Sequence, residues 1–175
     1  MKLVFPTYAY KDKAIRFIDE FYEYDSQING SGGLDRYLKT STYEEWIGKI
    51  HGDMDIANIP ESKVPALTYF YVREEDDQIL GMVNIRLALN DFLKREGGHI
   101  GYCVRPTERQ KHHATQMLQE ALNVLDAIGI REVIVTCDKS NIASAKVIQN
   151  CGGNLTEELY SNVFKSKIQK YIIYR

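Results

Sequence analysis

The stretch that decides the fold is GGHIGYCVRPTERQKHHATQMLQEAL, residues 97–122. Its first part predicts a strand over residues 97–105, which glycines weaken and Pro106 ends. Its last part opens a helix predicted over about residues 110–128, which Gly129 ends. Apolar residues recur along this helix at i, i+3, i+4 and i+7, namely Ala114, Met117, Leu118, Ala121, Leu122, Leu125 and Ile128. The stretch therefore predicts a strand, a basic loop and an amphipathic helix in that order.

The N-terminal part of the chain predicts a strand and two helices. A short strand over residues 2–7 precedes a helix over about residues 12–24, where apolar residues recur at helical spacing. The segment NGSGGLD at residues 29–35 predicts a flexible loop. Ser41 and Glu44 have the spacing of a capping box and predict the start of a second helix. One face of that helix is apolar and consists of Tyr43, Trp46, Ile47 and Ile50.

Apolar and β-branched segments predict the remaining strands. Two of them flank the polar turn EEDDQ (74–78) and form a hairpin, and EVIVTC has the composition of a strand buried on both faces. A short helix over residues 141–150 ends at Gly152 and Gly153. The strands expected here are residues 66–73, 79–89, 132–137, about 154–160 and about 163–174. The order of elements predicts an α+β (mixed α/β) fold, with a central, mostly antiparallel sheet of about six or seven strands and about four flanking helices.

Composition argues against several classes of protein. The chain has 175 residues, of which 44% are hydrophobic and 26% charged, so we expect a single domain over residues 1–175. A formal net charge of −2 gives no general attraction to nucleic acid or to an anionic membrane surface. No apolar run approaches the roughly 20 residues of a membrane span, and the N-terminus lacks the apolar region of a signal peptide. We therefore expect a cytoplasmic protein with no nucleic-acid or membrane partner.

Neither the cysteines nor the histidine doublet indicates a metal site. Cys103, Cys137 and Cys151 are odd in number and lack CxxC spacing, which favours reduced thiols over a disulfide framework or a zinc site. His112 and His113 are neighbours on the predicted helix, where adjacent side chains point about 100° apart and cannot easily chelate one ion. No bound metal is expected.

The basic loop between strand and helix is suited to bind phosphate. The first backbone N–H groups of a helix have no intrahelical partner and lie at the positive end of its dipole. Arg105, Arg109 and Lys111 add positive charge around that end. Neither GxxxxGKS/T nor GxGxxG occurs, so a P-loop nucleoside triphosphatase and a Rossmann dinucleotide enzyme are not indicated. The alternative is that these charges only solvate a surface turn.

The order of motifs around this loop resembles that of the GNAT superfamily of acetyl-CoA-dependent N-acyltransferases. The matching features are a strand ending in V-x-P (Val104 to Pro106), the segment RQKHHA (109–114) on R-x-x-G-x-A, a buried strand, and Asn141 to Ser144 on N-x-x-A/S. The resemblance covers residues 66–155, which it marks as a coenzyme A-binding core, and it marks residues 1–60 as acceptor-side helices. It implies a GNAT-like fold and transfer of an acetyl group from acetyl-CoA to a primary amine, in a small molecule or a protein, by direct attack in a ternary complex.

The resemblance also implies which residues contact the coenzyme. Backbone groups of residues 109–114 would cradle the pyrophosphate, and residues 102–104 would pair with the pantetheine arm, one N–H stabilising the oxyanion. His112 occupies the usual position of a glycine, and we expect it to keep helical φ/ψ and turn its side chain outward. The implied coenzyme-binding residues are Tyr102, Cys103, Val104, Arg109, Gln110, Lys111, His112, His113, Ala114, Asn141, Ser144 and Lys146.

Two residues are candidates for acid–base catalysis. His99 lies where the resemblance implies a glutamate facing the acceptor, and a pKa near neutrality suits a general base. The alternative is a half-exposed strand histidine without a role. Ile148 replaces the tyrosine that donates a proton to the leaving thiolate in many family members. Tyr160 is the second candidate, because it would reach the site from the next strand.

Several alternatives stay open at this point. Cys137 is a conceivable nucleophile for a ping-pong mechanism, although a small buried residue is the favoured interpretation. The departures at His112 and Ile148 favour an alternative function, a non-catalytic coenzyme A-binding regulatory module of the same fold. The sequence does not identify the acceptor. A homodimer through exposed sheet edges or terminal strands is a further expectation.

Overall fold

The computed structural model describes residues 1–175, except for the side chain of Asn58. In chain order the strands and α-helices are β1 (Lys2–Val4), α1 (Lys11–Glu23), α2 (Leu34–Thr40), α3 (Tyr43–Gly52), β2 (Ala66–Val72), β3 (Ile79–Arg86), β4 (Ile100–Val104), α4 (His113–Ala127), β5 (Glu132–Asp138), α5 (Ile142–Asn150), β6 (Asn154–Ser161) and β7 (Ser166–Tyr174). Short helical turns connect them: the 3-10 helices η1 (Tyr8–Tyr10), η2 (Ile56–Asn58) and η4 (Pro106–Glu108), and the π-helix η3 (Leu93–Gly97).

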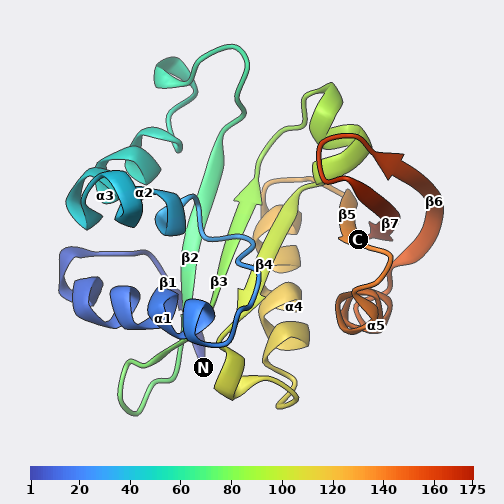
Figure 1. Cartoon of the computed structure of the whole chain (residues 1–175). Coiled ribbons are helices and arrows are strands. Elements are labelled where there is room, and N and C mark those ends of the chain that lie inside the picture. The colour runs from blue at the N-terminus through green and yellow to red at the C-terminus, as the bar shows by residue number, and fades with distance from the viewer.

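The strands form two sheets that separate between β4 and β5 (Figure 1). The first sheet has the order β1-β2-β3-β4 and the second the order β5-β7-β6, and all these pairings are antiparallel. At one end of the boundary, His99 N–H donates to Ile134 O at 2.7 Å and Ile134 N–H donates to Nδ1 of His99 at 2.9 Å. The antiparallel pairing confirms the prediction, but the expected central sheet is divided in two.

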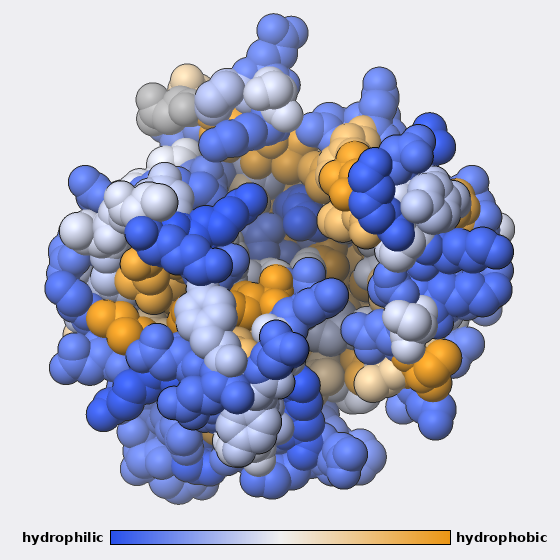
Figure 2. Space-filling model, viewed as in Figure 1, coloured by the Kyte–Doolittle hydropathy of each residue, from blue (hydrophilic) through white to orange (hydrophobic). Residues whose placement is uncertain are grey.

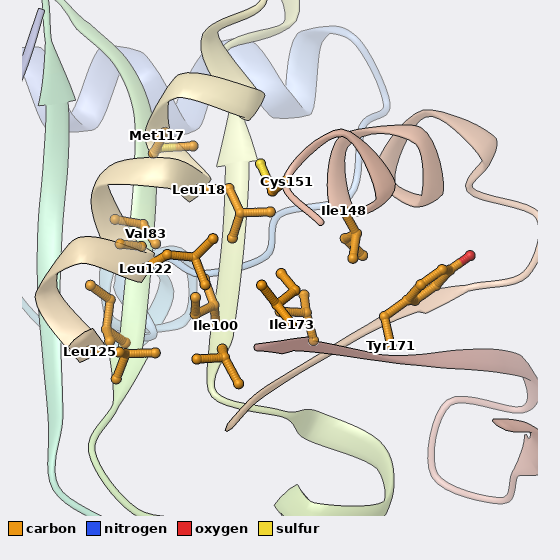
Figure 3. Close-up of a cluster of buried hydrophobic side chains, with 14 of the residues drawn as sticks. Val83, Ile100, Met117, Leu118, Leu122, Leu125, Ile148, Cys151, Tyr171 and Ile173 are labelled. Atoms are coloured by element: carbon orange, nitrogen blue, oxygen red, sulfur yellow. The ribbon is translucent and has the colours of Figure 1, made fainter. Parts of the chain in front are cut away.

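Helices cover both faces of the first sheet and one face of the second (Figure 1). On one face, α1, α2 and α3 share a core with β2 and β3, in which Trp46 stacks on Phe70. On the opposite face, α4 packs on β3 and β4, and α5 packs beside α4. Figure 3 shows Leu118 of α4, Ile148 of α5 and Ile173 of β7 gathered in this second core. The side chains of α4 and α5 therefore hold the two sheets together where backbone pairing is missing.

The apolar face predicted for α3 is confirmed, but its cap is shifted by one residue. The buried residues of α3 are Tyr43, Trp46, Ile47 and Ile50. Glu45 N–H donates to Oγ1 of Thr42, and Thr42 N–H donates to the Glu45 carboxylate, both at 3.2 Å. The predicted capping pair of Ser41 and Glu44 was therefore wrong. Ser41 ends α2, and Glu44 forms an ion pair with Lys11.

Three other segments differ from the sequence prediction. Helix α2 was not expected; it begins after Gly33, a residue in the left-handed region with a φ of 88°. The strand predicted over residues 97–105 is shortened because η3 and the turn at Gly98 precede it. Helix α4 begins at His113, because the residues before it form an irregular loop. Ile128 is 53% exposed at the end of α4 and does not close the apolar stripe.

Candidate active site

The N-terminal end of α4 presents a row of backbone N–H groups without acceptors. No N–H from Gln110 to Thr115 donates to an acceptor within the described residues, and the bond from Gln116 N–H to His112 O, 3.2 Å, opens the helix. Gln110 and His112 lie in the left-handed region, with φ of 63° and 64°, so the expectation that His112 keeps helical φ/ψ was wrong. Such turns direct successive N–H groups toward one side, which makes a concave anion site.

Glu20 of α1 fixes the loop that leads into this row. Its carboxylate accepts the Thr107 N–H at 3.0 Å and the Thr107 hydroxyl at 2.8 Å, and it forms an ion pair with Arg105. Arg105 is 7% exposed, and its Nε donates to Ile79 O at 2.7 Å. Burial by itself raises the pKa of Glu20, but hydrogen bonds from Thr107 and Arg105 outweigh burial and hold the pKa below its ordinary value. Arg105 is thus neutralised within the protein.

The other two cations of the loop also have protein partners. Arg109 donates from Nε to Val104 O at 3.2 Å and from Nη2 to Oγ of Ser26 at 2.6 Å. Lys111 donates to Glu108 at 2.8 Å. The Arg109 side chain ties the loop to the segment after α1, so the unpartnered anion-binding groups of this loop are backbone N–H groups.

The edge of β4 that faces β5 supplies further donors. Arg105 N–H donates to Leu80 O at 2.8 Å, and the direction of backbone groups alternates along a strand. Cys103 therefore pairs with β3, whereas Tyr102 and Val104 direct their N–H groups toward β5. The thiol of Cys103 lies in the core under α1–α3, where burial raises its pKa to about 12. Of the three residues expected beside the coenzyme, two have N–H groups that face the gap.

The opposite side of the gap is formed by the end of β5 and the start of α5. Asn141 caps α5 by accepting the Ser144 N–H at 3.0 Å, and Lys146 is exposed on the same helix. The hydroxyls of Tyr102 and Ser144 lie 3.0 Å apart and link β4 to α5 across the gap. Burial raises the pKa of the Cys137 thiol to about 11, which disfavours the thiolate that a ping-pong mechanism needs.

A hollow lies over the centre of the face that carries α1–α3, with hydrophilic atoms on its floor (Figure 2). Strands β2 and β3 direct Thr68, Asn84 and Arg86 to this face, since the residues between them belong to the core under α4. Nδ2 of Asn84 donates to Oγ1 of Thr68 at 3.1 Å, and Nη1 of Arg86 donates to Gly97 O and Gly98 O, both at 2.8 Å. Sequence reasoning missed Asn84 and Arg86, although polar residues at alternate positions of an apolar strand indicate a polar surface.

The glycine-rich loop at residues 29–33 borders the same strands. A Cβ on Gly30, which has a φ of 68°, would lie 2.1 Å from Gly101 O, and a Cβ on Gly32 would lie 2.6 Å from Oγ1 of Thr68. Gly32 O also accepts the indole N–H of Trp46 at 3.2 Å. The loop therefore rests directly on β2 and β4, an approach that only glycine permits.

His99, the candidate base, lies at the junction of the two sheets and is 7% exposed, so the half-exposed strand position considered for it was wrong. Its Nδ1 accepts the Ile134 N–H, so the neutral ring carries its proton on Nε2. Burial, with the positive charge of Arg86, holds the pKa of His99 below its ordinary value. The contacts of His99 join β4 to β5, and its role as a base stays a prediction.

The two positions considered for a general acid differ in burial. Ile148 is fully buried under α4 (Figure 3). Tyr160 is 53% exposed on β6, and β7 lies between β6 and β5 in the second sheet. Its catalytic role stays a prediction. A carboxylate that sequence reasoning missed is Glu96 of η3, which is 8% exposed and accepts the Ser161 hydroxyl at 2.6 Å.

The histidine doublet does not form a pair in space. His112 is exposed, whereas His113 is 9% exposed and its Nδ1 has no hydrogen-bond partner. Within the described residues, no group of three or more histidine, cysteine or acidic side chains is placed to hold a metal ion. Among the helices that the structure describes, none has the length and apolar character needed to cross a membrane.

Comparisons with known proteins agree with this geometry. The model of the acetyltransferase (GNAT) domain family matches residues 19–154, whereas no curated protein sequence matches the chain. The microcin C7 self-immunity acetyltransferase MccE, solved with acetyl-CoA and AMP, is 17% identical with a TM-score of 0.66, over 99% of this chain and 91% of MccE. The ribosomal L7/L12 alpha-N-protein acetyltransferase RimL, solved with coenzyme A, is 16% identical with a TM-score of 0.69, over 98% and 92%. A variant of the spermidine N-acetyltransferase SpeG from Vibrio cholerae is 12% identical with a TM-score of 0.64, over 99% and 95%. These likenesses show the fold.

Proposed function

Because the chain belongs to the acetyltransferase (GNAT) domain family, we propose that it transfers an acetyl group from acetyl-CoA to a primary amine of a small molecule or a protein. The row of free backbone N–H groups at the start of α4, beside the gap between β4 and β5, carries this proposal. An acyl coenzyme can use both features, because its pyrophosphate requires donors and the amides of its arm can pair with a free strand edge. The bound acetyl-CoA of MccE and the bound coenzyme A of RimL, which have the same fold, support it.

In this proposal the coenzyme is bound mainly by backbone. The pyrophosphate accepts hydrogen bonds from N–H groups of residues 110–114, and the pantetheine arm runs along the edge of β4 beside Tyr102, whose hydroxyl bonds to Ser144. Tyr102 N–H faces the gap and stabilises the oxyanion that forms on the thioester carbonyl. Asn141 and Lys146 flank the arm from α5.

The chemical step is direct attack by the amine. The amine nitrogen bonds to the thioester carbonyl carbon, the carbon–sulfur bond breaks, coenzyme A leaves as a thiolate, and the amine gives up a proton. The high pKa values of Cys103, about 12, and Cys137, about 11, support a ternary complex over an acyl-cysteine intermediate. His99 is the proposed base, and it accepts the proton at Nδ1 only if it releases the Ile134 N–H. Tyr160 is the proposed acid.

The alternative is a non-catalytic coenzyme A-binding regulatory module of the same fold. One observation favours it: the positions expected to supply an acid or a base are hydrogen-bonded within the protein, occupied by an apolar residue, or on an edge strand. Nδ1 of His99 is occupied, Ile148 is buried and apolar, and Tyr160 lies on the outer strand β6.

Binding and turnover separate the two functions. Calorimetric titration with coenzyme A measures binding, and thiol release from acetyl-CoA over a panel of amines measures transfer. His112→Asp places a carboxylate beside the free N–H groups and is expected to weaken coenzyme affinity about tenfold through like-charge repulsion. His112→Asn is the neutral control of the same shape and should retain affinity.

The outcomes are distinct. Thiol release that depends on an amine, and that falls in His112→Asp but not in His112→Asn, supports the enzyme. Coenzyme binding without thiol release on any amine supports the regulatory module. Equal coenzyme affinity in the wild type and His112→Asp would show that the coenzyme does not bind at the start of α4. Both proposed functions would then lose their basis.

A further inference from the structure

Arg86 is a partly buried cation that no carboxylate of the protein neutralises. It forms no ion pair with any carboxylate among the described residues, and burial lowers the pKa of its guanidinium. Arg105, at the other end of the same pair of strands, is more deeply buried, at 7% exposure, and is paired with Glu20. Removing a charge from water is unfavourable unless an opposite charge or hydrogen bonds compensate it. Arg86 therefore lacks a counterion within the described part of the protein.

The unused part of Arg86 is one edge of its guanidinium. Nη1 donates to Gly97 O and Gly98 O, whereas Nε and Nη2 have no acceptor within the described residues. Within the described residues, the one side-chain nitrogen or oxygen atom that is both fully buried and without a hydrogen-bond partner is Nδ1 of His113. Nε and Nη2 of Arg86, which lack partners, are therefore accessible to solvent. Nε and Nη2 present two parallel N–H groups, the geometry that matches the two oxygens of a carboxylate.

This free edge lies beside the strand where the acetyl group is proposed to sit. A Cβ built on Gly101 would be 3.7 Å from Nη2 of Arg86, and Gly101 directly precedes Tyr102, the proposed oxyanion donor. Arg86 shares its face with Asn84 and Thr68, on the face where Figure 2 shows the hollow. Glu96 is the nearby buried acid, and its carboxylate is engaged with Ser161 rather than with Arg86.

We propose that Arg86 binds a carboxylate of the acceptor, so that the substrate is an amino acid or short peptide whose amine lies close to a carboxylate. This inference rests on the proposed acetyl transfer and names the substrate class for that site. A bidentate carboxylate supplies the missing charge and two acceptors at once. The same cation repels a second positive charge, which disfavours polyamines and favours the neutral, reactive form of the acceptor amine.

The test uses matched acceptors that differ only in the carboxylate. The kcat/KM for acetyl transfer is measured with glycine, β-alanine, L-aspartate and L-phenylalanine, with the primary amide of each, and with spermidine. The wild type is expected to prefer acids over amides and to use spermidine poorly. Arg86→Met should lower the acid-to-amide ratio by about 10- to 100-fold, the range of a charge-assisted hydrogen-bond pair, and Arg86→Lys should restore part of it. Arg95→Met removes an equal charge from an exposed arginine of η3 and should leave the ratio unchanged.

The result that overturns the inference is an acid-to-amide ratio that is the same in the wild type and Arg86→Met, or efficient acetylation of spermidine by the wild type. If no amine is acetylated, the proposed function has failed rather than this inference. The inference is then decided by calorimetric binding of the N-acetylated acids and amides, which need no turnover. If Arg86→Met does not fold, Arg86→Gln retains a donor toward Gly97 and Gly98, and the wild-type ratio by itself still decides.

Discussion

Each end of the β3–β4 pair carries an arginine that is at least partly buried, and the two arginines differ in whether a carboxylate balances their charge. At the end that leads to α4, Arg105 donates to Ile79 O and is paired with Glu20. At the end that meets β5, Arg86 donates to Gly97 O and Gly98 O and has no carboxylate among the described residues. The first end pairs its cation with a carboxylate, which also holds the loop in place through Thr107. The second end leaves one edge of its guanidinium without an acceptor among the described residues.

The backbone shows the opposite difference. The loop after Arg105 holds Gln110 and His112 in the left-handed region, which costs an L-residue about 1–2 kcal/mol each. The turn beside Arg86 uses Gly98, whose φ of 63° costs a glycine little. The α4 end thus carries backbone strain that aims N–H groups at an anion, and the other end carries an uncompensated charge. At each end the unfavourable feature suits a ligand. The strained backbone directs N–H groups at an anion, and the unbalanced charge of Arg86 attracts a carboxylate.

The largest expected effect is at the compensated end. Glu20→Ala leaves Arg105 buried without a counterion and is expected to lower the free energy of unfolding by about 3 kcal/mol, measured by urea denaturation at pH 7. Because the pKa of Glu20 is depressed in the folded state, this stabilisation is present at neutral pH and is lost as pH falls through that lowered pKa. Glu44→Ala, which breaks the solvent-exposed pair with Lys11, should cost much less stability than Glu20→Ala. Equal losses in the free energy of unfolding in the two variants would contradict the role of Glu20 as the counterion of the buried Arg105.

The same measurement at the other end should give a smaller change. Arg86→Met removes two hydrogen bonds but also a partly buried charge without a counterion, so we expect the free energy of unfolding to change by less than about 1.5 kcal/mol in either direction. A loss as large as that of Glu20→Ala would show that Arg86 mainly clamps the η3 turn, and the contrast between the two ends would disappear.

The sequence predicted the parts of the molecule that local pattern determines. The apolar stripe of α4 from Met117 to Leu125 and the apolar run of β5 specify their elements because burial on one or both faces fixes the residue type. Helix α2 was missed because its few residues follow a glycine-rich segment and depend on packing of Leu34 under α3. The division of the sheet was likewise out of reach, since it depends on which strand edges meet after folding.

The candidate site was predicted unevenly for the same reason. The loop at the start of α4 carries a local motif, so its backbone role followed from residues 109–114. Arg109 was expected to add charge there, but its partner Ser26 lies far away in the sequence, and no local pattern indicates that contact. Arg86 was missed because a lone arginine at a strand end usually lies in solvent. Only the tertiary structure shows that it has no carboxylate.

A third prediction concerns pH at the Arg86 end. Burial and the charge of Arg86 hold the pKa of His99 below its ordinary value, so the unfolded chain binds a proton more readily than the folded chain. Stability should therefore fall as pH drops below about 6.5, by at most about 1.4 kcal/mol per pH unit for this group. His99→Gln can still accept the Ile134 N–H and should flatten this slope, whereas substitution of the exposed His51 should not. If the dependence of stability on pH is unchanged in His99→Gln, His99 is not the group that causes it. A pH–rate profile that is the same in His99→Gln and wild type would rule out His99 as the base.

The smallest effect tests the strain at the α4 end. His112→Gly relieves a left-handed histidine, although glycine also adds entropy to the unfolded chain, so we expect a gain in stability of up to about 1 kcal/mol. Gln110→Gly should change stability in the same direction, because Gln110 has the same conformation. Glu120→Gly, in the regular part of α4, should instead lose about 1 kcal/mol. If His112→Gly loses stability as Glu120→Gly does, the histidine has contacts that offset its conformation. If it gains stability and also binds coenzyme A more tightly, the Cβ of His112 is what keeps a phosphate from closest approach to the N–H groups.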